Sequence, residues 1–296
     1  MHARLKNSGY TIVEVMIFLA VSGLMFVIAA QFVSGKQTQA EFKDSVSSTN
    51  SKIDQVINDI SNGYYPAPNS YLCQATAGGI SISSGSNSQG SNQGCAFLGK
   101  VIQFGLKGTN GNGYNVYSVA GCQFNPCGTA DLTPPFSFSE AKPLVVDDQN
   151  PAYSVTGVNM TEDLTLDWQA SATAVYDIDP TGTFNNIGAI GFFASFANQN
   201  GSGLSSGSQS INVVPISNSS PLSSGGDDEK TMIADINTDL NGSPVIRTSP
   251  NIVICLNSNH GQVAEISIGG GNGQRLTTTT QISNAPIQLG SGKSCS

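Results

Sequence analysis

The sequence predicts an α+β fold, in which a long N-terminal helix packs against a β-rich domain with an antiparallel sheet and long loops. Three observations predict it. Residues 15–35 form a run without charges, apolar residues recur at helical spacing between residues 42 and 60, and short β-branched runs separated by Gly, Asn and Pro follow residue 63. We therefore expect a helix over residues 10–62 and a β-rich domain over residues 63–296.

The composition limits the functions that are open to this chain. Only 11% of its 296 residues are charged, against about a quarter in an average soluble protein, and the formal net charge is −8. This acidic balance argues against nucleic-acid binding, which needs basic residues to neutralise phosphates. The two histidines, His2 and His260, leave few groups for metal ligation or acid–base catalysis. With 39% hydrophobic residues, the chain can nevertheless bury a core.

The N-terminal apolar run predicts a helix over residues 10–35 that crosses a membrane. Its uncharged part is as long as the roughly 20 residues that a helix needs to cross a bilayer. Arg4 and Lys6 precede the run, so the positive-inside rule places the N-terminus in the cytoplasm and the chain after Lys36 outside. A cleaved secretory signal, an uncleaved signal anchor and a buried helix of a soluble domain are the alternatives. The run is long for a secretory signal, and a buried helix needs no basic leader.

Glu14 is the one charge between residues 10 and 35, and a plain signal anchor leaves it unexplained. A carboxylate in a membrane helix costs about 2.5–3.5 kcal/mol on insertion scales, and less near the interface. Cleavage between Gly9 and Tyr10 would create an α-amine one helical turn from Glu14, near the positive end of the helix dipole. In an apolar medium, Glu14 of one subunit could neutralise the Tyr10 amine of its neighbour. This pairing predicts assembly of subunits side by side.

A short basic leader therefore ends in Gly9, Tyr10 follows, and Glu14 stands within an apolar run, in the sequence GYTIVE. This pattern resembles the cleavage signal of type IV prepilins and type II secretion pseudopilins. The resemblance implies that a prepilin peptidase removes the leader, residues 1–9, and N-methylates Tyr10, and that Glu14 sets the register during assembly. The chain departs from the family in carrying Tyr at position 10, where most members carry Phe. It also lacks the Pro that many pilins have midway along the helix.

The resemblance implies a structural protein without a cofactor, and not an enzyme. We expect a subunit of a type IV pilus-like filament that assembles with other pilin subunits through its N-terminal helix and serves surface attachment or motility. The precursor is expected in the cytoplasmic membrane with its N-terminus inside, and the assembled subunit at the cell surface. A minor pseudopilin of a type II secretion or DNA-uptake machine is one alternative, which the mature length of 287 residues favours. A monomeric surface adhesin held by a signal anchor is the other.

Beyond residue 35 the helix is expected to continue to a stop at Asn62-Gly63. One apolar stripe predicts the face that contacts the globular domain, and it consists of Phe42, Val46, Ile53, Ile57 and Ile60. The predicted strands are Val101–Leu106, Tyr114–Val119, Leu164–Trp168, Ala172–Ile178, Ile187–Ala194, Ile211–Ile216, Ile252–Leu256, Val263–Ile268 and Thr277–Ile282. Stretches rich in Ser, Gly and Asn at 78–94 and 198–226 predict long exposed loops. The run 251–269 resembles the paired C-terminal strands of some minor pseudopilins.

Six cysteines lie on the predicted outer side, where an even number favours disulfides. Metal ligation would need neighbouring histidines or C-x-x-C pairs, which the sequence lacks. Six cysteines permit 15 pairings, but proximity favours pairing sequence neighbours: Cys73 with Cys95, Cys122 with Cys127 and Cys255 with Cys295. The last pair would resemble the disulfide-closed C-terminal region of many pilins.

A weak calcium candidate lies in the sequence DINTDLNG, residues 235–242. Its oxygen-bearing side chains alternate at Asp235, Asn237 and Asp239, as they do in a calcium loop. Gly242 comes two residues late for an EF-hand and no closing Glu follows, so an Asx-rich turn is the alternative and we assign no metal. The neighbouring acidic run, residues 227–229, is expected to be a solvated charge cluster.

No catalytic constellation is found. Residues 203–207 match the G-x-S-x-G pattern of hydrolases, but they lie in a predicted loop with no strand before and no helix after them. His260, the one histidine left after removal of the leader, lies in a predicted surface turn. The Gly-rich run 269–273 lacks the spacing and the following helix of a phosphate-binding loop.

Overall fold

The structure is a computed structural model. It describes residues 11–62, 71–85, 94–128, 135, 137–150, 155–194, 211–217, 220, 222, 225–242, 244–247, 250–270 and 276–296. The chain divides into two compact units, Met1–Glu41 and Phe42–Ser296.

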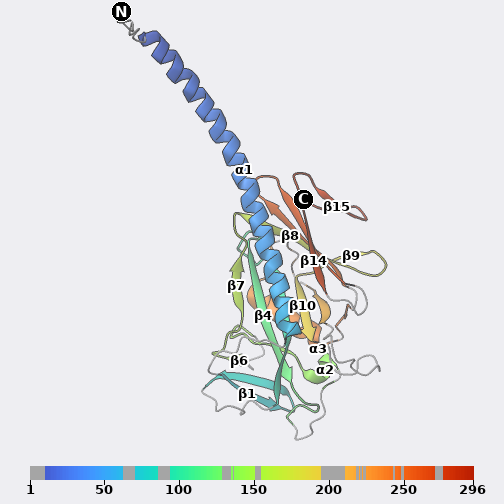
Figure 1. The fold of residues 1–296 in the computed structure, drawn as a ribbon. Coiled ribbons are helices and arrows are strands. Elements are labelled where there is room, and N and C mark those ends of the chain that lie inside the picture. The colour runs from blue at the N-terminus through green and yellow to red at the C-terminus, as the bar shows by residue number, and fades with distance from the viewer. Residues whose placement is uncertain are drawn as a thin grey trace, which may run out of the picture. The chain divides into compact units, whose positions relative to one another are not determined.

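The described elements confirm the predicted α+β class, with a long N-terminal helix followed by a β-rich domain (Figure 1). The helices are α1 (Ile12–Ser61), α2 (Phe138–Ala141) and α3 (Glu229–Asn241). The strands are β1 (Tyr71–Thr76), β2 (Gly79–Ser84), β3 (Cys95–Phe104), β4 (Gly113–Cys122), β5 (Leu144–Val145), β6 (Val155–Thr156), β7 (Glu162–Thr165), β8 (Ala170–Ile178), β9 (Phe184–Asn186), β10 (Ala189–Ala194), β11 (Ile211–Ile216), β12 (Asn251–Ser258), β13 (Val263–Gly269), β14 (Thr277–Ser283), β15 (Ile287–Gly290) and β16 (Lys293–Cys295).

The helix α1 is continuous over 50 residues, which confirms the predicted helical segment. Its sequence contains no Pro, and it ends at Ser61, next to the predicted stop. The predicted apolar stripe is buried throughout, because Phe42, Val46, Ile53, Ile57 and Ile60 are each at most 3% exposed. Val56, which the stripe leaves out, is buried as well. Each such side chain contributes about 1.5–3 kcal/mol by leaving water, so this face holds the second half of α1 on the globular domain.

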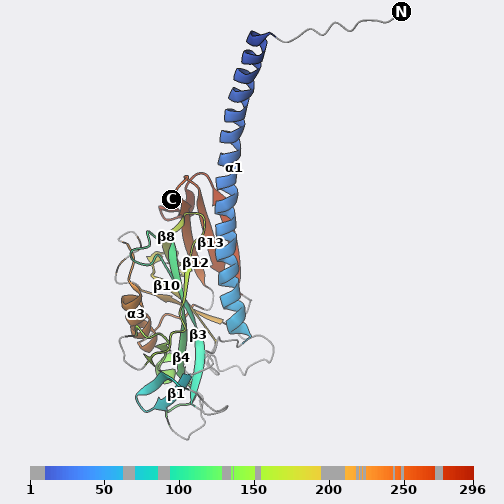
Figure 2. The same cartoon turned by 90° about the vertical axis from the view of Figure 1, so that its left-hand side faces the viewer.

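Two antiparallel sheets form most of the globular domain. The β3–β4 sheet has the order β11-β10-β3-β4-β5, with β7 also paired to β4. The β12–β13 sheet has the order β14-β13-β12-β8-β9, and Figure 2 shows β12 and β13 beside the second half of α1. Two smaller sheets have the orders β1-β2-β6 and β15-β16.

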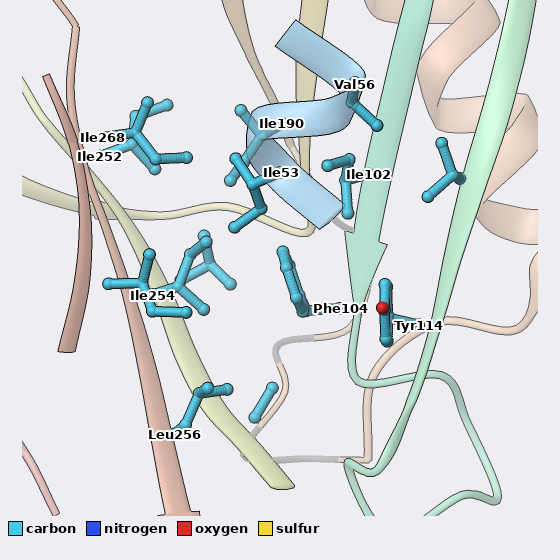
Figure 3. Packing of buried hydrophobic residues seen from close by; sticks show 14 of the residues in the cluster. Ile53, Val56, Ile102, Phe104, Tyr114, Ile190, Ile252, Ile254, Leu256 and Ile268 are labelled. Atoms are coloured by element: carbon cyan, nitrogen blue, oxygen red, sulfur yellow. The ribbon is translucent and has the colours of Figure 1, made fainter. Parts of the chain in front are cut away.

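The main core lies where the second half of α1 meets these two sheets. Ile53 of α1 lies between Ile102 of the β3–β4 sheet and Ile252 of the β12–β13 sheet (Figure 3). The rings of Phe104 and Tyr114 stack at the edge of this cluster, with centroids 5.5 Å apart. One helical face therefore closes the gap between two sheets that do not pair with each other.

Every predicted strand overlaps a strand of the structure, but two sequence expectations were wrong. Residues 79–84, expected within a loop, form β2, because Ile80 and Ile82 alternate with serines and are buried. Residues 86–93 of that expected loop, and 198–210 of the other, lie outside the described residues, whereas 211–216 form β11. The run Leu164–Trp168 is strand only to Thr165, because the chain then turns into β8.

The three disulfides are those that proximity favours. Cys73 of β1 bonds to Cys95 of β3, Cys122 to Cys127 at the end of β4, and Cys255 of β12 to Cys295 of β16, with Cα–Cα distances of 6.3, 5.5 and 5.1 Å. Among the described residues no cysteine is free. The third bond attaches the C-terminal hairpin, β15 and β16, to the β12–β13 sheet.

A cluster of four charges, in which Lys100 is buried and the others are partly buried, connects α1 to the β3–β4 sheet. The Lys100 side chain is only 2% exposed, and its Nζ lies 2.9 Å from a carboxylate oxygen of Asp59 and 3.7 Å from one of Glu162. Lys52 completes the cluster with an ion pair to Glu162. Two positive and two negative groups therefore balance one another beside the core.

Replacing Asp59 by Ala is expected to lower the free energy of unfolding of the globular domain by about 3 kcal/mol, because it leaves the Lys100 ammonium buried without its nearest partner. Urea unfolding of the full chain in mild detergent, followed by tryptophan fluorescence, measures this loss. Lys52→Met is the matched control. It removes a more exposed pair and is expected to cost about 1 kcal/mol or less. Equal losses in the two variants would contradict this account of the cluster.

Candidate functional site

The candidate site is the first half of α1, residues 12–35. All described side chains of this segment are exposed, and several are large, such as Ile12 at 77% and Phe26 at 75%. Among the described residues, the other exposed large hydrophobic side chains are Trp168 and Val245 alone. A contiguous apolar surface of this length marks a membrane or protein interaction site.

This helix is also long and apolar enough to cross a membrane, and no other helix in the described ranges is. Gly23 and Gly35, the two glycines of the segment, have no atom within 4 Å of where a Cβ would stand. The helix is continuous across both glycines.

Glu14 lies in the first turn of α1 and is exposed. Its backbone N–H donates to Thr11 Oγ1 at 3.3 Å. Thr11 and Glu14 thus have the spacing of a capping box, in which an acidic third residue favours the start of a helix. Sequence analysis missed this local role, although the T-x-x-E pattern is its signal. Gly9 and Tyr10, the predicted cleavage and methylation sites, lie outside the described residues.

The calcium candidate was wrong in its loop geometry, because residues 235–242 belong mostly to α3. The helix begins after Asp228, whose side chain accepts a hydrogen bond from the Thr231 N–H at 2.9 Å. Met232, Ile233, Ile236 and Leu240 form its buried face, and their helical spacing was the overlooked signal.

The oxygen atoms of the calcium candidate do not converge on α3. Asp235 and Asp239 share one face of the helix, whereas Asn237 points to the opposite side. Asn237 Oδ1 accepts from the Val145 N–H at 3.0 Å, and Asp239 accepts from the Ser217 N–H at 2.9 Å. Within the part of the chain that the structure describes, no group of three or more His, Cys, Asp or Glu residues could hold a metal ion.

The acidic run 227–229 is not the solvated cluster that the sequence predicts. Asp227 is buried, and Glu229 is half-buried and hydrogen-bonded to the fully buried Asp147. Burial, together with the negative charges of Asp147 and Asp163, raises the pKa of Glu229 from 4.5 to about 7. The folded chain therefore holds a proton on Glu229 at pH values at which the unfolded chain has lost it.

This proton makes the stability of the globular domain depend on pH. Between about pH 4.5 and 7 the folded state binds more protons at Glu229 than the unfolded state, so stability falls as the pH rises through that window and is level above it. A Glu229→Gln variant is expected to lack this decline and to melt at a higher temperature than the natural chain at pH 8. Melting curves from pH 4 to 8 test it, and parallel profiles for the two proteins would contradict the assignment.

The remaining candidates from the sequence belong to the second unit. His260 is exposed in the turn between β12 and β13, as the sequence predicts. Residues 203–207 lie outside the described residues. The six predicted disulfide cysteines lie in the globular domain, where two of the bonds connect strands and the third joins the end of β4 to the turn that follows it.

The structure thus joins an exposed apolar helix with an acidic first turn to a folded, disulfide-bonded β-rich domain. Comparisons of the chain with protein-family models, with curated proteins and with solved structures found no significant match.

Proposed function

We propose that this chain is a type IV pilin-like subunit, which is inserted in the cytoplasmic membrane as a precursor, cut after Gly9 and assembled into a helical filament through residues 10–35. The single observation that carries the proposal is the first half of α1. It is an apolar helix whose described side chains are all exposed, with one carboxylate, Glu14, in its first turn. A capping box can use Gln as well as Glu at this place, whereas pairing with an amine needs the charge of the carboxylate.

The assembly follows from the two charges at the start of the helix. Removal of the leader takes away Arg4 and Lys6 and leaves the α-amine of Tyr10 as the one positive charge at the N-terminal end of the apolar run. This amine and Glu14 of a neighbouring copy neutralise each other in an apolar medium, where either charge alone is costly. The contact joins different faces of two copies, so it propagates as a fibre.

Burial of apolar side chains contributes more to the free energy of filament assembly than the charge pair does. Every exposed side chain of the first half of α1 that packs between neighbouring helices leaves water or lipid, and the helices gain close contacts. The second half of α1 is buried in its own domain and serves as the attachment of that domain to the assembled helices. The globular domain then forms the outer surface of the filament.

Fractionation of cells that express the chain tests this proposal. The chain is expected in surface material that is released by shearing, sediments as filaments and binds an antibody against the globular domain along its length. A Gly9→Val variant is the control, because it keeps the apolar run and changes the predicted cleavage site. It is expected to stay in the membrane fraction.

The result that contradicts the proposal is recovery of the natural chain as a monomer from detergent-extracted membranes, with none in the sheared fraction. That outcome would support a surface protein held by a signal anchor.

A further inference from the structure

Trp168 is the one tryptophan of the chain, and it stands at the tip of the turn between β7 and β8 with 57% of its surface exposed. Its φ is +56°, and that of Gln169 is +59°. The Ala170 N–H donates to the Asp167 carbonyl across the turn at 3.2 Å. Two successive left-handed residues match a type I′ turn, whose positions are normally taken by Asn and Gly.

A bulky residue in this conformation costs about 1–3 kcal/mol and persists where the surroundings hold it. The surroundings do so here. The Leu166 N–H donates to the Asn112 carbonyl at 2.7 Å, and the Asn259 side chain donates to Gln169 Oε1 at 3.2 Å. The turn is therefore fixed on both sides, and more than half of the surface of Trp168 stays exposed.

The second unit, Phe42–Ser296, has one end at which Phe42 lies, and we call it the Phe42 end. The turn that carries Trp168 lies at this end. The contacts of the β3–β4 sheet with α1 show which end of the sheet lies toward Phe42. Lys100 of β3 contacts Asp59. Further along the same sheet, Glu162 of β7 contacts Lys52, which lies about two helical turns nearer Phe42. From Glu162, β7 continues in this direction into the turn.

The turn between β12 and β13 lies at the same end, because Ser258 stands opposite Ala170 in the pairing of β12 with β8. Asn259 and His260 of that turn are exposed beside the tryptophan turn. The Phe42 end thus presents an indole accompanied by amide and imidazole groups. Indole groups with polar neighbours are typical of side chains that occupy the headgroup layer of a bilayer.

Few residues connect the Phe42 end with the apolar run. Residues 36–41 alone separate the uncharged run from Phe42, and they are helical. Six helical residues rise about 9 Å. The polar layer on each side of a bilayer core is about 5–8 Å thick. When the apolar run spans the bilayer, a connection of this length is short enough for the Phe42 end to reach the headgroups.

We propose that Trp168 is an interfacial membrane anchor, through which the Phe42 end of the folded domain binds the headgroup layer of the membrane that holds the unassembled subunit. This inference rests on the proposed membrane insertion of the precursor. The anchor orients the folded domain at the membrane surface before assembly, and it is released when the subunit moves into a filament. An anchoring role also explains why the turn carries Trp168 and Gln169. Asn and Gly at these two positions would adopt the left-handed conformation with less strain, but they would provide no indole.

The single tryptophan allows a direct test on the full-length chain. The protein is reconstituted in vesicles of phosphatidylcholine and phosphatidylglycerol, with or without lipids that carry a spin label near the headgroup. We expect the label to reduce the emission of Trp168 about twofold or more, because the indole lies in the headgroup layer. Emission that is unchanged by the label and is fully quenched by acrylamide would overturn the proposal.

Two reporter variants in a Trp168→Phe background make the outcome specific. Phe18→Trp places the reporter in the apolar run, and a spin label deep in the acyl chains is expected to quench it. Val245→Trp is the matched surface control and is expected to respond to neither label. Val245 lies two residues before Arg247, which pairs with Val213 of β11. Val213 stands at the level of Lys100 in the β3–β4 sheet, away from the Phe42 end.

The two failures are distinguishable. If the deep label quenches Phe18→Trp while Trp168 stays open to water, the anchor is refuted and membrane insertion stands. If the deep label fails to quench Phe18→Trp, the helix is not inserted, and the proposed function falls together with the anchor.

Discussion

A Glu14→Ala variant is expected to fold and to insert into the membrane but to be absent from filaments, with at least a tenfold loss of incorporation. Without the carboxylate, the Tyr10 amine of a neighbouring copy would enter the apolar helix bundle unpaired. The cost of burying an unpaired charge is several kcal/mol, and each 1.4 kcal/mol is a factor of ten in an equilibrium. The measurement is the ratio of variant to natural subunit in sheared filaments from cells that express both.

Two further variants distinguish charge pairing from helix capping. Gln keeps the shape of Glu14 and can complete a capping box with Thr11, but it carries no charge. We expect Glu14→Gln to fail in assembly as Glu14→Ala does. Glu41→Ala, which removes a carboxylate of the same helix beyond the apolar run, is expected to assemble normally. Incorporation of Glu14→Gln at the natural level would contradict pairing and would leave capping as the role of Glu14.

Loss of the disulfide between Cys255 and Cys295 is expected to cause the largest loss of stability in the globular domain, about 4 kcal/mol. The two cysteines are separated by 40 residues, and a bond that closes a long loop restricts the unfolded chain most. It also holds the hairpin β15–β16 on the β12–β13 sheet, with Ile287 buried between them. Urea unfolding of a Cys255→Ser, Cys295→Ser double variant, followed by Trp168 fluorescence in mild detergent, measures the loss.

Cys122 and Cys127 provide the matched control. They are five residues apart, so the same pair of substitutions there is expected to cost about 2 kcal/mol. A larger loss from the short bond than from the long one would show that native contacts, and not loop closure, dominate the effect.

The helix α1 was predictable because its signals are local. An uncharged run and an apolar stripe both depend on residues a few positions apart, and no distant partner has to be known. The strands β12 and β13 were predictable for the same reason, since Val263–Gly269 alternates buried and half-buried residues along its length. The disulfide pairs followed from proximity because each cysteine pairs with its sequence neighbour.

The missed elements depend on distant partners or on mixed signals. The strand β2 is rich in Ser and Gly, which have a low propensity for strands. Its pairing with β1 and β6 stabilises it as a strand despite this composition. The helix α3 was hidden by its Asp and Asn residues, which favour turns, although Asp228 is a good N-cap and its apolar residues have helical spacing.

The candidate site was predictable only in part. The apolar run and Glu14 follow from the sequence, because charge and hydropathy are properties of the residues themselves. Trp168 did not, since residues 164–168 have the composition of a strand and nothing local shows that the chain reverses at Trp168 in a left-handed turn. Its place at the Phe42 end depends on the register of β7 against β4.

The central claim is that proteolysis after Gly9 creates the amine that Glu14 of an adjacent subunit neutralises. The intact mass and N-terminal sequence of the chain, taken from the surface of cells, test it most directly. The account predicts a polypeptide that begins at Tyr10 and carries one N-methyl group on its α-amine. A chain that retains Met1 and all nine leader residues, and that is recovered as a monomer, would contradict it.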